Sequence, residues 1–336
     1  MRIKVTLFLI ISFVSLASFV MRDFALPYPS YYPKPQYNFK NNLLDSSKIS
    51  LGRHLFYDPI LSADNTISCA SCHSPYNAFS HTDHTLSHGI NDQIGSRNAP
   101  ALFNLAWQKS FMWDGASNHL ELQALAPINH PKEMGETTLG VVKKLNASKF
   151  YRNLFFRAYQ DSTVTGERML KTLAQFQLTL VSANAKYDRI KKGNDVFTEQ
   201  EKNGYSLFLE NCNSCHSEPL FSNYNFANNG LKIDTTLNDF GRWLVSKKSQ
   251  DSLLFKTPSL RNLSFSSPYM HDGRFKKLGE VINHYTNGVQ QSKTLSIALK
   301  KAIVLTSNEK IDLIAFLLTL NDTSFVFDSQ NKYPKK

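Results

Sequence analysis

The chain has 336 residues, a formal net charge of +11 and only four cysteines. This length allows two ordinary domains. No cluster of Lys and Arg is interleaved with aromatic residues, so we expect no nucleic-acid partner, and the positive charge suits either solubility or an acidic redox partner.

The first 40 residues indicate export. Residues 1–20 place Arg2 and Lys4 before an apolar run slightly shorter than a full membrane span, which predicts a signal peptide or a membrane anchor. Residues 21–40 are rich in proline and tyrosine, and we expect them to form a tether rather than a packed element. We expect contact with a membrane only if residues 1–20 stay attached as an anchor.

Two Cys-x-x-Cys-His motifs account for every cysteine in the chain. Covalent haem attachment uses this pattern, because two thiols bond to the haem vinyl groups and the next histidine ligates the iron. A thiol redox motif is usually flanked by a βαβ pattern, a zinc ribbon keeps its two pairs close together, and two disulfides would leave both histidines without a role. We therefore predict two covalent haem c groups. Their thioether anchors and proximal ligands are Cys69, Cys72, His73, Cys212, Cys215 and His216.

Helices joined by long loops are expected around both motifs. Residues 198–211 and 306–320 each begin with the capping box Thr-x-x-Glu and continue with apolar residues on one face. The first of these leads into the second haem motif. We expect the helix before the first motif in residues 51–61 and the closing helix after it in residues 167–181. A helix before the motif and a closing helix after it are typical of a small c-type cytochrome domain.

An internal repeat supports a division into two related domains. Residues 98–115 (NAPALFNLAWQKSFMWDG) and 256–273 (KTPSLRNLSFSSPYMHDG) align on a proline and end in the same Met-x-Asp-Gly pattern. The charged stretch 184–195 is the expected boundary. We predict an all-α protein of two cytochrome c-like domains, residues 41–188 and 189–336, each binding one haem.

Several segments resemble the bacterial di-haem cytochrome c peroxidases and their relatives, the di-haem oxidases of methylamine utilisation. The resemblance runs from about residue 45 to 320 and is carried by LGRHLFYDPILSADNTISCASCH, GSRNAPALFN, MWDG, LELQALAPINHPKEM, TPSLRN and PYMHDGRF. It implies a periplasmic enzyme whose N-terminal haem reacts with hydrogen peroxide and whose C-terminal haem handles electrons. It also implies a calcium ion, and a homodimer stays open.

Three residues of the N-terminal half take catalytic roles from this resemblance. Glu133 falls at the acid/base position, where a carboxylate moves a proton from one peroxide oxygen to the other. Gln123 matches the amide that positions peroxide or water, and Trp113 matches the tryptophan that relays electrons between the haems. Without the resemblance, Glu133 and Gln123 would be read as surface groups and Trp113 as a core residue.

The resemblance also implies metal ligands. His88 falls where the peroxidases carry a removable ligand that caps the peroxidatic iron in the resting state, and His81 and His84 are competitors nearby. Oxygen donors suit calcium. The calcium ligands that the resemblance implies are Asn98 and the carbonyl oxygens of Ser266 and Pro268.

The second haem departs from the simplest peroxidase. Where standard peroxidases have an axial methionine, this chain has Tyr285, as the methylamine-type oxidases do. Thioether ligation favours reduced iron, whereas an anionic phenolate favours oxidised iron. Met270 and His284 are alternative ligands for this haem.

Together these features predict a di-haem peroxidase that reduces hydrogen peroxide to water with electrons from a small c-type cytochrome or a cupredoxin. Two alternatives stay open: a di-haem oxidase that modifies side chains of a partner protein, and a non-catalytic di-haem electron-transfer cytochrome. Because a peroxidase-like His88 accompanies an oxidase-like Tyr285, the resemblance alone does not identify the physiological reductant.

Overall fold

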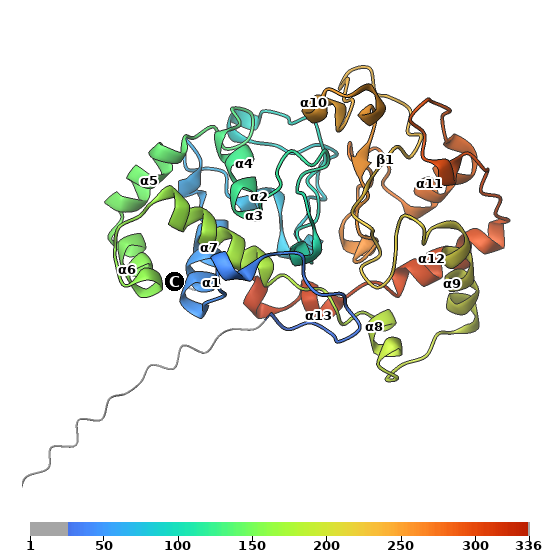
Figure 1. The fold of residues 1–336 in the computed structure, drawn as a ribbon, viewed down its shortest axis with the longest axis horizontal. Coiled ribbons are helices and arrows are strands. Elements are labelled where there is room, and N and C mark those ends of the chain that lie inside the picture. Colours follow the sequence, from blue (N-terminus) through green and yellow to red (C-terminus); the bar gives the residue numbers. More distant parts are fainter. Residues whose placement is uncertain (1–25, 335–336) are drawn as a thin grey trace, which may run out of the picture.

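The computed structural model describes residues 26–334, and within them the chain is largely helical (Figure 1). Strand structure in this range is limited to β1 (Phe226–Ala227) and β2 (Phe255–Lys256), which pair antiparallel. The predicted export signal or anchor, residues 1–20, lies outside the described residues. Within residues 26–334, no helix is both long enough and apolar enough to cross a bilayer.

The helices form two halves that follow each other along the chain (Figure 1). The N-terminal half, residues 26–185, contains α1 (Ser46–Tyr57), α2 (Cys69–Cys72), α3 (Leu120–Gln123), α4 (Leu125–Asn129), α5 (Thr138–Ala147), α6 (Lys149–Tyr159) and α7 (Gly166–Leu178). The C-terminal half, residues 186–320, contains α8 (Lys186–Lys191), α9 (Glu199–Asn211), α10 (Trp243–Ser246), α11 (Leu278–Asn283) and α12 (Ser307–Leu318). A C-terminal segment, residues 321–334, contains α13 (Thr323–Val326).

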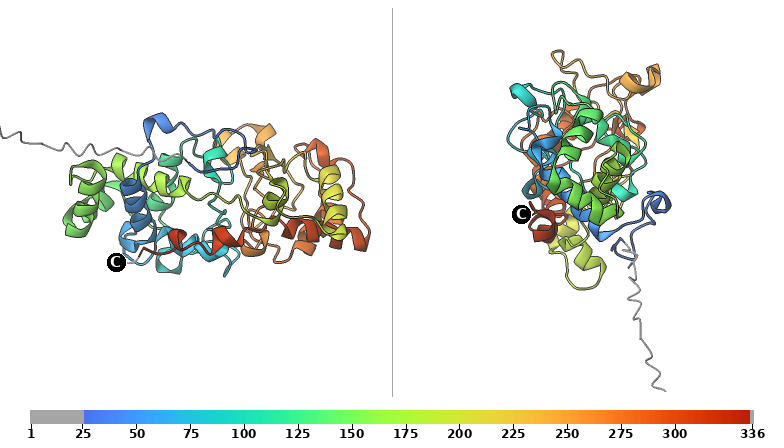
Figure 2. Two further views of the ribbon diagram at one scale, coloured as in Figure 1. Left: turned by 90° about the horizontal axis from the view of Figure 1, so that it is seen from below. Right: turned by 90° about the vertical axis from the view of Figure 1, so that its left-hand side faces the viewer.

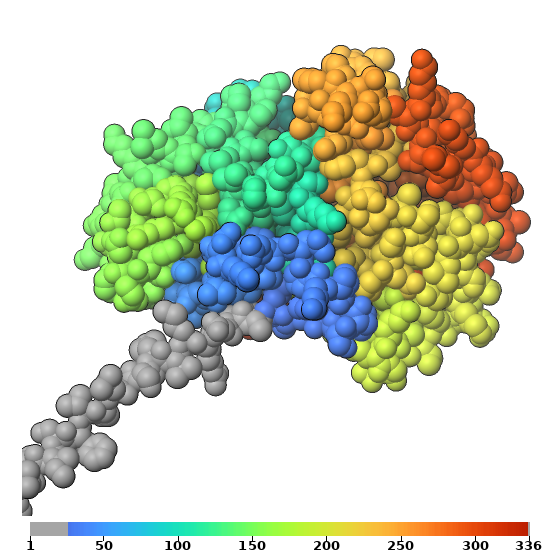
Figure 3. Space-filling model, in the orientation of Figure 1, coloured from blue at the N-terminus to red at the C-terminus, as the bar shows by residue number. Residues whose placement is uncertain are grey.

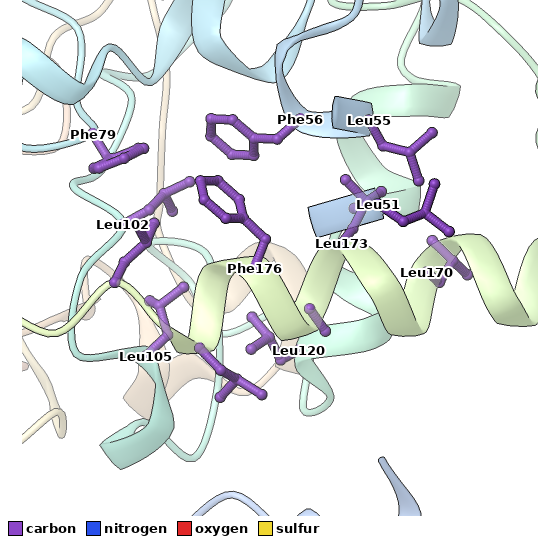
Figure 4. Packing of buried hydrophobic residues seen from close by; sticks show 14 of the residues in the cluster. Leu51, Leu55, Phe56, Phe79, Leu102, Leu105, Leu120, Leu170, Leu173 and Phe176 are labelled. Carbon is purple, nitrogen blue, oxygen red and sulfur yellow. The ribbon is translucent and has the colours of Figure 1, made fainter. Parts of the chain in front are cut away.

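Helices α1 and α7 cross closely and carry the core of the N-terminal half. Gly52 on α1 faces the Thr172 carbonyl oxygen on α7, where any Cβ atom would collide with the backbone. This close approach packs Phe56 against Phe176 with ring centroids 5.2 Å apart, among leucines of both helices (Figure 4). Burying each side chain of this size contributes about 1.5–3 kcal/mol. Cys69 of the first haem motif packs against this core.

Helices α9 and α12 repeat this crossing in the C-terminal half. Gly204 on α9 meets the Asp312 carbonyl oxygen on α12, again with no room for a Cβ atom. Phe208 and Phe316 pack between the helices with ring centroids 5.0 Å apart. Both helices begin with the predicted Thr-x-x-Glu capping box. The two halves therefore share this helix crossing as well as the repeated segments 98–115 and 256–273.

The stretch predicted to be a tether packs onto the protein, so that prediction is wrong for residues 26–40. Tyr32 is 4% exposed, and its hydroxyl donates a hydrogen bond of 3.0 Å to the Ser182 carbonyl oxygen. The Trp107 indole N–H donates to the Pro33 carbonyl oxygen at 2.7 Å. In Figure 3 this blue segment lies along the lower face, where the two halves meet. The tyrosines bury their rings and pair their hydroxyls, which composition alone does not reveal.

The C-terminal segment packs on the N-terminal half, although the predicted domain boundary assigns it to the C-terminal domain. The Phe325 ring lies 5.9 Å from the Phe79 ring and 6.0 Å from the Phe103 ring, measured between centroids. The Arg53 side chain donates from Nε to the Lys332 carbonyl oxygen at 2.6 Å. In Figures 1 and 2 the dark red chain returns from α12 to the far side of α1. A few apolar residues after α12 gave no indication of which core they would join.

Several polar contacts join the two halves. The Arg97 guanidinium binds Asp114 of its own half at 2.6 Å and Asp239 of the other half at 2.6 Å. The Trp113 carbonyl oxygen accepts a hydrogen bond of 2.7 Å from the backbone N–H of Lys256. These contacts place the Met-x-Asp-Gly turn of the N-terminal half directly against the C-terminal half.

Candidate active site

The first Cys-x-x-Cys-His motif forms one helical turn. Helix α2 comprises the four residues from Cys69 to Cys72, and the His73 backbone N–H closes the turn on the Cys69 carbonyl oxygen at 2.9 Å. The ring Nδ1 of His73 lies 2.8 Å from the Phe79 carbonyl oxygen. Because a carbonyl only accepts, Nδ1 carries the proton and Nε2 keeps its lone pair for a metal ion.

The second motif repeats this arrangement. Cys212 caps the C-terminal end of α9, and the His216 backbone N–H donates to the Cys212 carbonyl oxygen at 2.9 Å. The His216 Nδ1 lies 3.1 Å from the Pro258 carbonyl oxygen and 3.3 Å from that of Phe221. This imidazole is therefore held in the same tautomer as His73, with Nε2 free.

Burial sets the protonation of both motifs. Burial lowers the pKa of His73 and of His216 to about 4, so both rings are neutral at physiological pH and can ligate a metal. All four thiols are free within the described residues, so the two disulfides considered from the sequence do not form. Four thiols and two oriented imidazoles fit two covalently attached haem groups.

A single cavity of about 660 Å³ is lined by both motifs and by residues of both halves. Its lining is mostly apolar, and the polar groups that reach it come from a few segments. The predicted site residues that line it are Cys69, Cys72, His73, His88, Asn98, Trp113, Gln123, Glu133, Cys212, Cys215, His216, Ser266, Pro268, Met270 and Tyr285. Of the alternatives weighed from the sequence, His81, His84 and His284 are not among the lining residues.

Glu133 and His88 reach the cavity from neighbouring loops. The Ile90 backbone N–H donates to the Glu133 carbonyl oxygen at 2.8 Å, and a Cβ atom at Gly89 would collide with the Glu133 backbone. Cys72 Sγ lies 3.5 Å from the His88 carbonyl oxygen, so both loops lie beside the first motif. Burial raises the pKa of the Glu133 carboxyl group, and His130 partly offsets this effect. A half-buried carboxyl with a raised pKa suits proton transfer.

His81, His84 and His88 share one loop but differ in their position relative to the cavity. The His84 and His88 rings stack with centroids 4.2 Å apart, and His81 lies 5.4 Å from His84 on the other side. His81 is 9% exposed, and its Nδ1 is buried without a hydrogen-bond partner among the described residues. Only His88 of the three lines the cavity.

Gln123 and Trp113 both line the cavity. Helix α3 ends at Gln123, whose Nε2 lies 3.5 Å from the Met112 sulfur. The Trp113 indole N–H donates to the Asn98 carbonyl oxygen at 2.9 Å, and this bond fixes the ring between the halves. Met112 has a φ of 70°, a value that residues other than glycine seldom adopt, and the equivalent Met270 has a φ of 75°. The repeat therefore extends to the backbone of the turn that carries Trp113.

Tyr285 lies on a single π-helical turn, His284–Gly288, that follows α11 directly. π-helical turns often occur at functional sites. Burial raises the pKa of Tyr285 to about 12, while a hydrogen bond from the Asn229 side chain acts in the opposite direction. The Asn229 amide also lies 3.4 Å from the Met270 sulfur. His284 points elsewhere, since its Nε2 lies 3.0 Å from the Asn229 carbonyl oxygen.

The predicted calcium ligands lie at the junction of the halves. Asn98 is 6% exposed, its backbone N–H donates to the His271 carbonyl oxygen at 2.7 Å, and its side-chain Nδ2 donates to the Thr85 carbonyl oxygen at 3.1 Å. Its Oδ1 stays available as an oxygen ligand. Within residues 26–334, no group of three or more His, Cys, Asp and Glu side chains could hold a metal ion. A calcium ion here would depend on amide and carbonyl oxygens.

Lys256 is among the polar residues of the cavity that the sequence reasoning missed. Three cationic side chains are among the lining residues, and two of them have carboxylate partners, Arg97 with Asp239 and Arg261 with a buried aspartate. The third, Lys256, donates from Nζ to the Gln108 Oε1 at 2.6 Å and to the Ser110 carbonyl oxygen at 2.9 Å. Burial lowers the pKa of Lys256 to about 7. In the sequence, the only indication of a role for Lys256 was its position two residues before Pro258, the proline on which the repeated segments align.

Comparisons with known proteins agree with this geometry. A family model described as di-haem cytochrome c peroxidase matches residues 46–196. The methylamine utilization protein MauG of Methylorubrum extorquens is 37% identical over 304 residues, which cover 87% of this chain and 82% of that protein. Cytochrome c peroxidase Ccp of Escherichia coli is 32% identical over 296 residues, which cover 85% of this chain and 61% of that protein.

The fold agrees as well. The crystal structure of a MauG-like protein associated with microbial copper homeostasis matches with a TM-score of 0.84 at 30% identity, over 93% of this chain and 99% of that one. The two Cys-x-x-Cys-His motifs therefore carry two covalently bound haem c groups, and the protein is an oxidoreductase. The chain belongs to the di-haem cytochrome c peroxidase family.

Proposed function

We propose that this protein is a periplasmic di-haem peroxidase that reduces hydrogen peroxide to water with electrons from a small c-type cytochrome or a cupredoxin. One observation carries the proposal: Glu133, Gln123 and His88 line the same cavity as the first haem motif, and the loops of Glu133 and His88 lie beside that motif. In this proposal the N-terminal half is a peroxidatic cytochrome c domain and the C-terminal half an electron-transfer cytochrome c domain.

The bound haems supply the iron at which peroxide is reduced and a store for a second oxidising equivalent. The surrounding side chains supply the proton chemistry. The Glu133 carboxyl group takes a proton from one peroxide oxygen and returns it to the other, so that the departing oxygen leaves as water. Gln123 would position the peroxide with its amide. Trp113, whose indole N–H is held by the Asn98 carbonyl oxygen, would relay electrons between the two haems.

Three ligands complete the proposal. His88 would ligate the N-terminal haem in the resting state, because it alone of the three loop histidines lines the cavity. Tyr285 would ligate the C-terminal haem, with Met270 as the alternative that also lines the cavity. Asn98 binds calcium with the carbonyl oxygens of Ser266 and Pro268.

A second function, oxidation of side chains on a partner protein, is favoured by one observation. Tyr285 lines the cavity together with the second haem motif, and a phenolate ligand would favour oxidised iron. Such a site stores oxidising equivalents rather than accepting electrons readily. The 37% identity to the methylamine utilization protein MauG fits this second function.

Steady-state turnover distinguishes the two functions. The holoprotein is mixed with hydrogen peroxide and a reduced c-type cytochrome, and cytochrome oxidation is followed by absorbance. We expect two cytochromes oxidised per peroxide consumed. Peroxide consumption without cytochrome oxidation would favour the oxidase function. If no peroxide is consumed, the only remaining function is that of a non-catalytic electron-transfer cytochrome.

A further inference from the structure

The chain between the π-helical turn and α12 forms the outer wall of the cavity's C-terminal part. Ser296, Ala298, Leu299, Ile303 and Leu305 line the cavity together with the second haem motif. In Figures 1 and 3 this chain, coloured orange-red, lies at the outer edge of the C-terminal half. A single layer of chain thus separates the second haem motif's cavity from the surroundings.

Two large apolar side chains of this wall point outward. Ile297 is 84% exposed and Val304 is 85% exposed, the two highest values among the large apolar side chains that the structure describes. Isolated exposed apolar residues need no explanation. Here, however, both lie on one short wall directly over the cavity.

Three lysines lie close in sequence to these two side chains. Lys293, Lys300 and Lys301 are exposed, and residues 281–308 contain no aspartate or glutamate. The acidic residues that flank this stretch are engaged in helix caps: Glu280 accepts from the backbone N–H groups of two lysines, and Glu309 caps α12. This stretch of the wall therefore carries two exposed apolar side chains and three exposed lysines, and it has no carboxylate of its own.

We propose that the donor face, which consists of Lys293, Ile297, Lys300, Lys301 and Val304, docks a small acidic electron-transfer protein. The inference rests on the proposed function, in which electrons enter through the C-terminal haem. In each encounter the donor's metal centre loses one electron and the C-terminal haem iron gains it. Weak redox encounters bury less than about 1,200 Å² in total, so the docking of such a partner needs only a small contact surface. The lysines steer an acidic partner, and the apolar pair excludes water from the contact.

The test measures reduction of the ferric holoprotein by stopped flow without peroxide. The probes are a reduced plastocyanin with an acidic surface and a reduced cytochrome c with a basic surface. We expect plastocyanin to react roughly tenfold faster or more at low ionic strength, and its rate to fall steeply as salt is added. Equal rates with the two probes, or a plastocyanin rate independent of salt, would overturn the proposal.

Variants locate the effect. Lys300→Glu/Lys301→Glu is expected to slow reduction by plastocyanin roughly tenfold, and Ile297→Ser/Val304→Ser to slow it without changing the salt dependence. The matched control is Lys143→Glu/Lys149→Glu, which makes the same change in net charge at exposed positions of the N-terminal half. Neutral hydroquinone, which has no charge to be steered, checks that every variant keeps a reducible haem.

Two results would contradict this assignment. The control pair slowing plastocyanin as much as the donor-face pair would show an effect of net charge alone. Binding of the parent protein to phosphatidylglycerol vesicles, lost in Ile297→Ser/Val304→Ser while plastocyanin kinetics stay unchanged, would show a membrane contact instead. Because no peroxide is present, failure of the peroxidase proposal leaves these measurements intact.

Discussion

Replacing Glu133 by glutamine separates proton transfer from the other roles of this side chain. Glutamine has nearly the same size and can still form hydrogen bonds, but it cannot carry a proton from one peroxide oxygen to the other. A positioned general acid/base typically contributes 10²–10⁴-fold, which corresponds to about 2.7–5.4 kcal/mol of transition-state stabilisation. We therefore expect peroxide turnover to fall by roughly 10²-fold or more.

The pKa of Glu133 predicts the variant's stability. Burial raises the pKa of the folded carboxyl, so the folded state holds this proton more tightly than the unfolded state. In the parent this group contributes most stability below its unfolded pKa, and that contribution is lost as pH rises through the folded pKa. Glu133→Gln removes the charged form and should unfold at the same or a higher temperature at neutral pH.

The matched control is Glu136→Gln. Glu136 lies three residues further along, outside the residues that line the cavity, and its carboxylate binds Lys144 Nζ at 2.8 Å. The hydrogen bond from Lys144 lowers the pKa of Glu136, so the stability it contributes is present above its unfolded pKa. Glu136→Gln should cost at most about 1 kcal/mol of stability and leave turnover unchanged.

The assay is peroxide turnover of the half-reduced holoprotein, in which the proposed His88 ligand has left the iron. Absorbance spectra of both haems check that the site is intact. Parent-like turnover by Glu133→Gln under these conditions would refute the acid/base role. Loss of turnover in Glu136→Gln as well would point to a general disturbance of the loop.

Three further variants test the other assignments. Tyr285→Met should raise the reduction potential of the C-terminal haem by about 59 mV or more, a tenfold change in its reduction equilibrium, and an unchanged potential and spectrum would exclude this ligand. Asn98→Ala should lower the calcium that atomic emission detects after dialysis, and an unaltered content would remove Asn98 from the calcium site. Gly204→Ala should lower the free energy of unfolding in urea by about 1–3 kcal/mol, because its methyl group meets the Asp312 carbonyl oxygen. The control Gly279→Ala has nothing within 4 Å of its new Cβ atom and should change this free energy by less than about 1 kcal/mol. Equal effects of the two variants would contradict the close crossing of α9 and α12.

The haem motifs and the helices beside them could be predicted because local patterns determine them. The Cys-x-x-Cys-His spacing places two thiols and an imidazole on one helical turn wherever the turn lies in the fold. The Thr-x-x-Glu boxes likewise act within four residues, and both helices begin where these boxes predict.

Long-range contacts were the part that the sequence did not reveal. The hydrogen bond from Tyr32 to Ser182 joins positions 150 apart, and a proline-rich and tyrosine-rich composition does not indicate such a partner. Lys256 has an ordinary sequence context, and only the fold brings it to Gln108 and the cavity. The choice between His88 and its neighbours also required the fold, because His81, His84 and His88 share one short loop.

The packing of the C-terminal segment has a consequence for the order of assembly. Phe325 and Val326 belong to the hydrophobic core that includes Phe79, and Cys69 of the first haem motif packs against this core. A chain that emerges from its N-terminus presents the first Cys-x-x-Cys-His motif more than two hundred residues before these two side chains exist. Attachment of the first haem can therefore precede completion of the core around it. A chain truncated after α12 would carry the motif in a half that lacks these two core side chains.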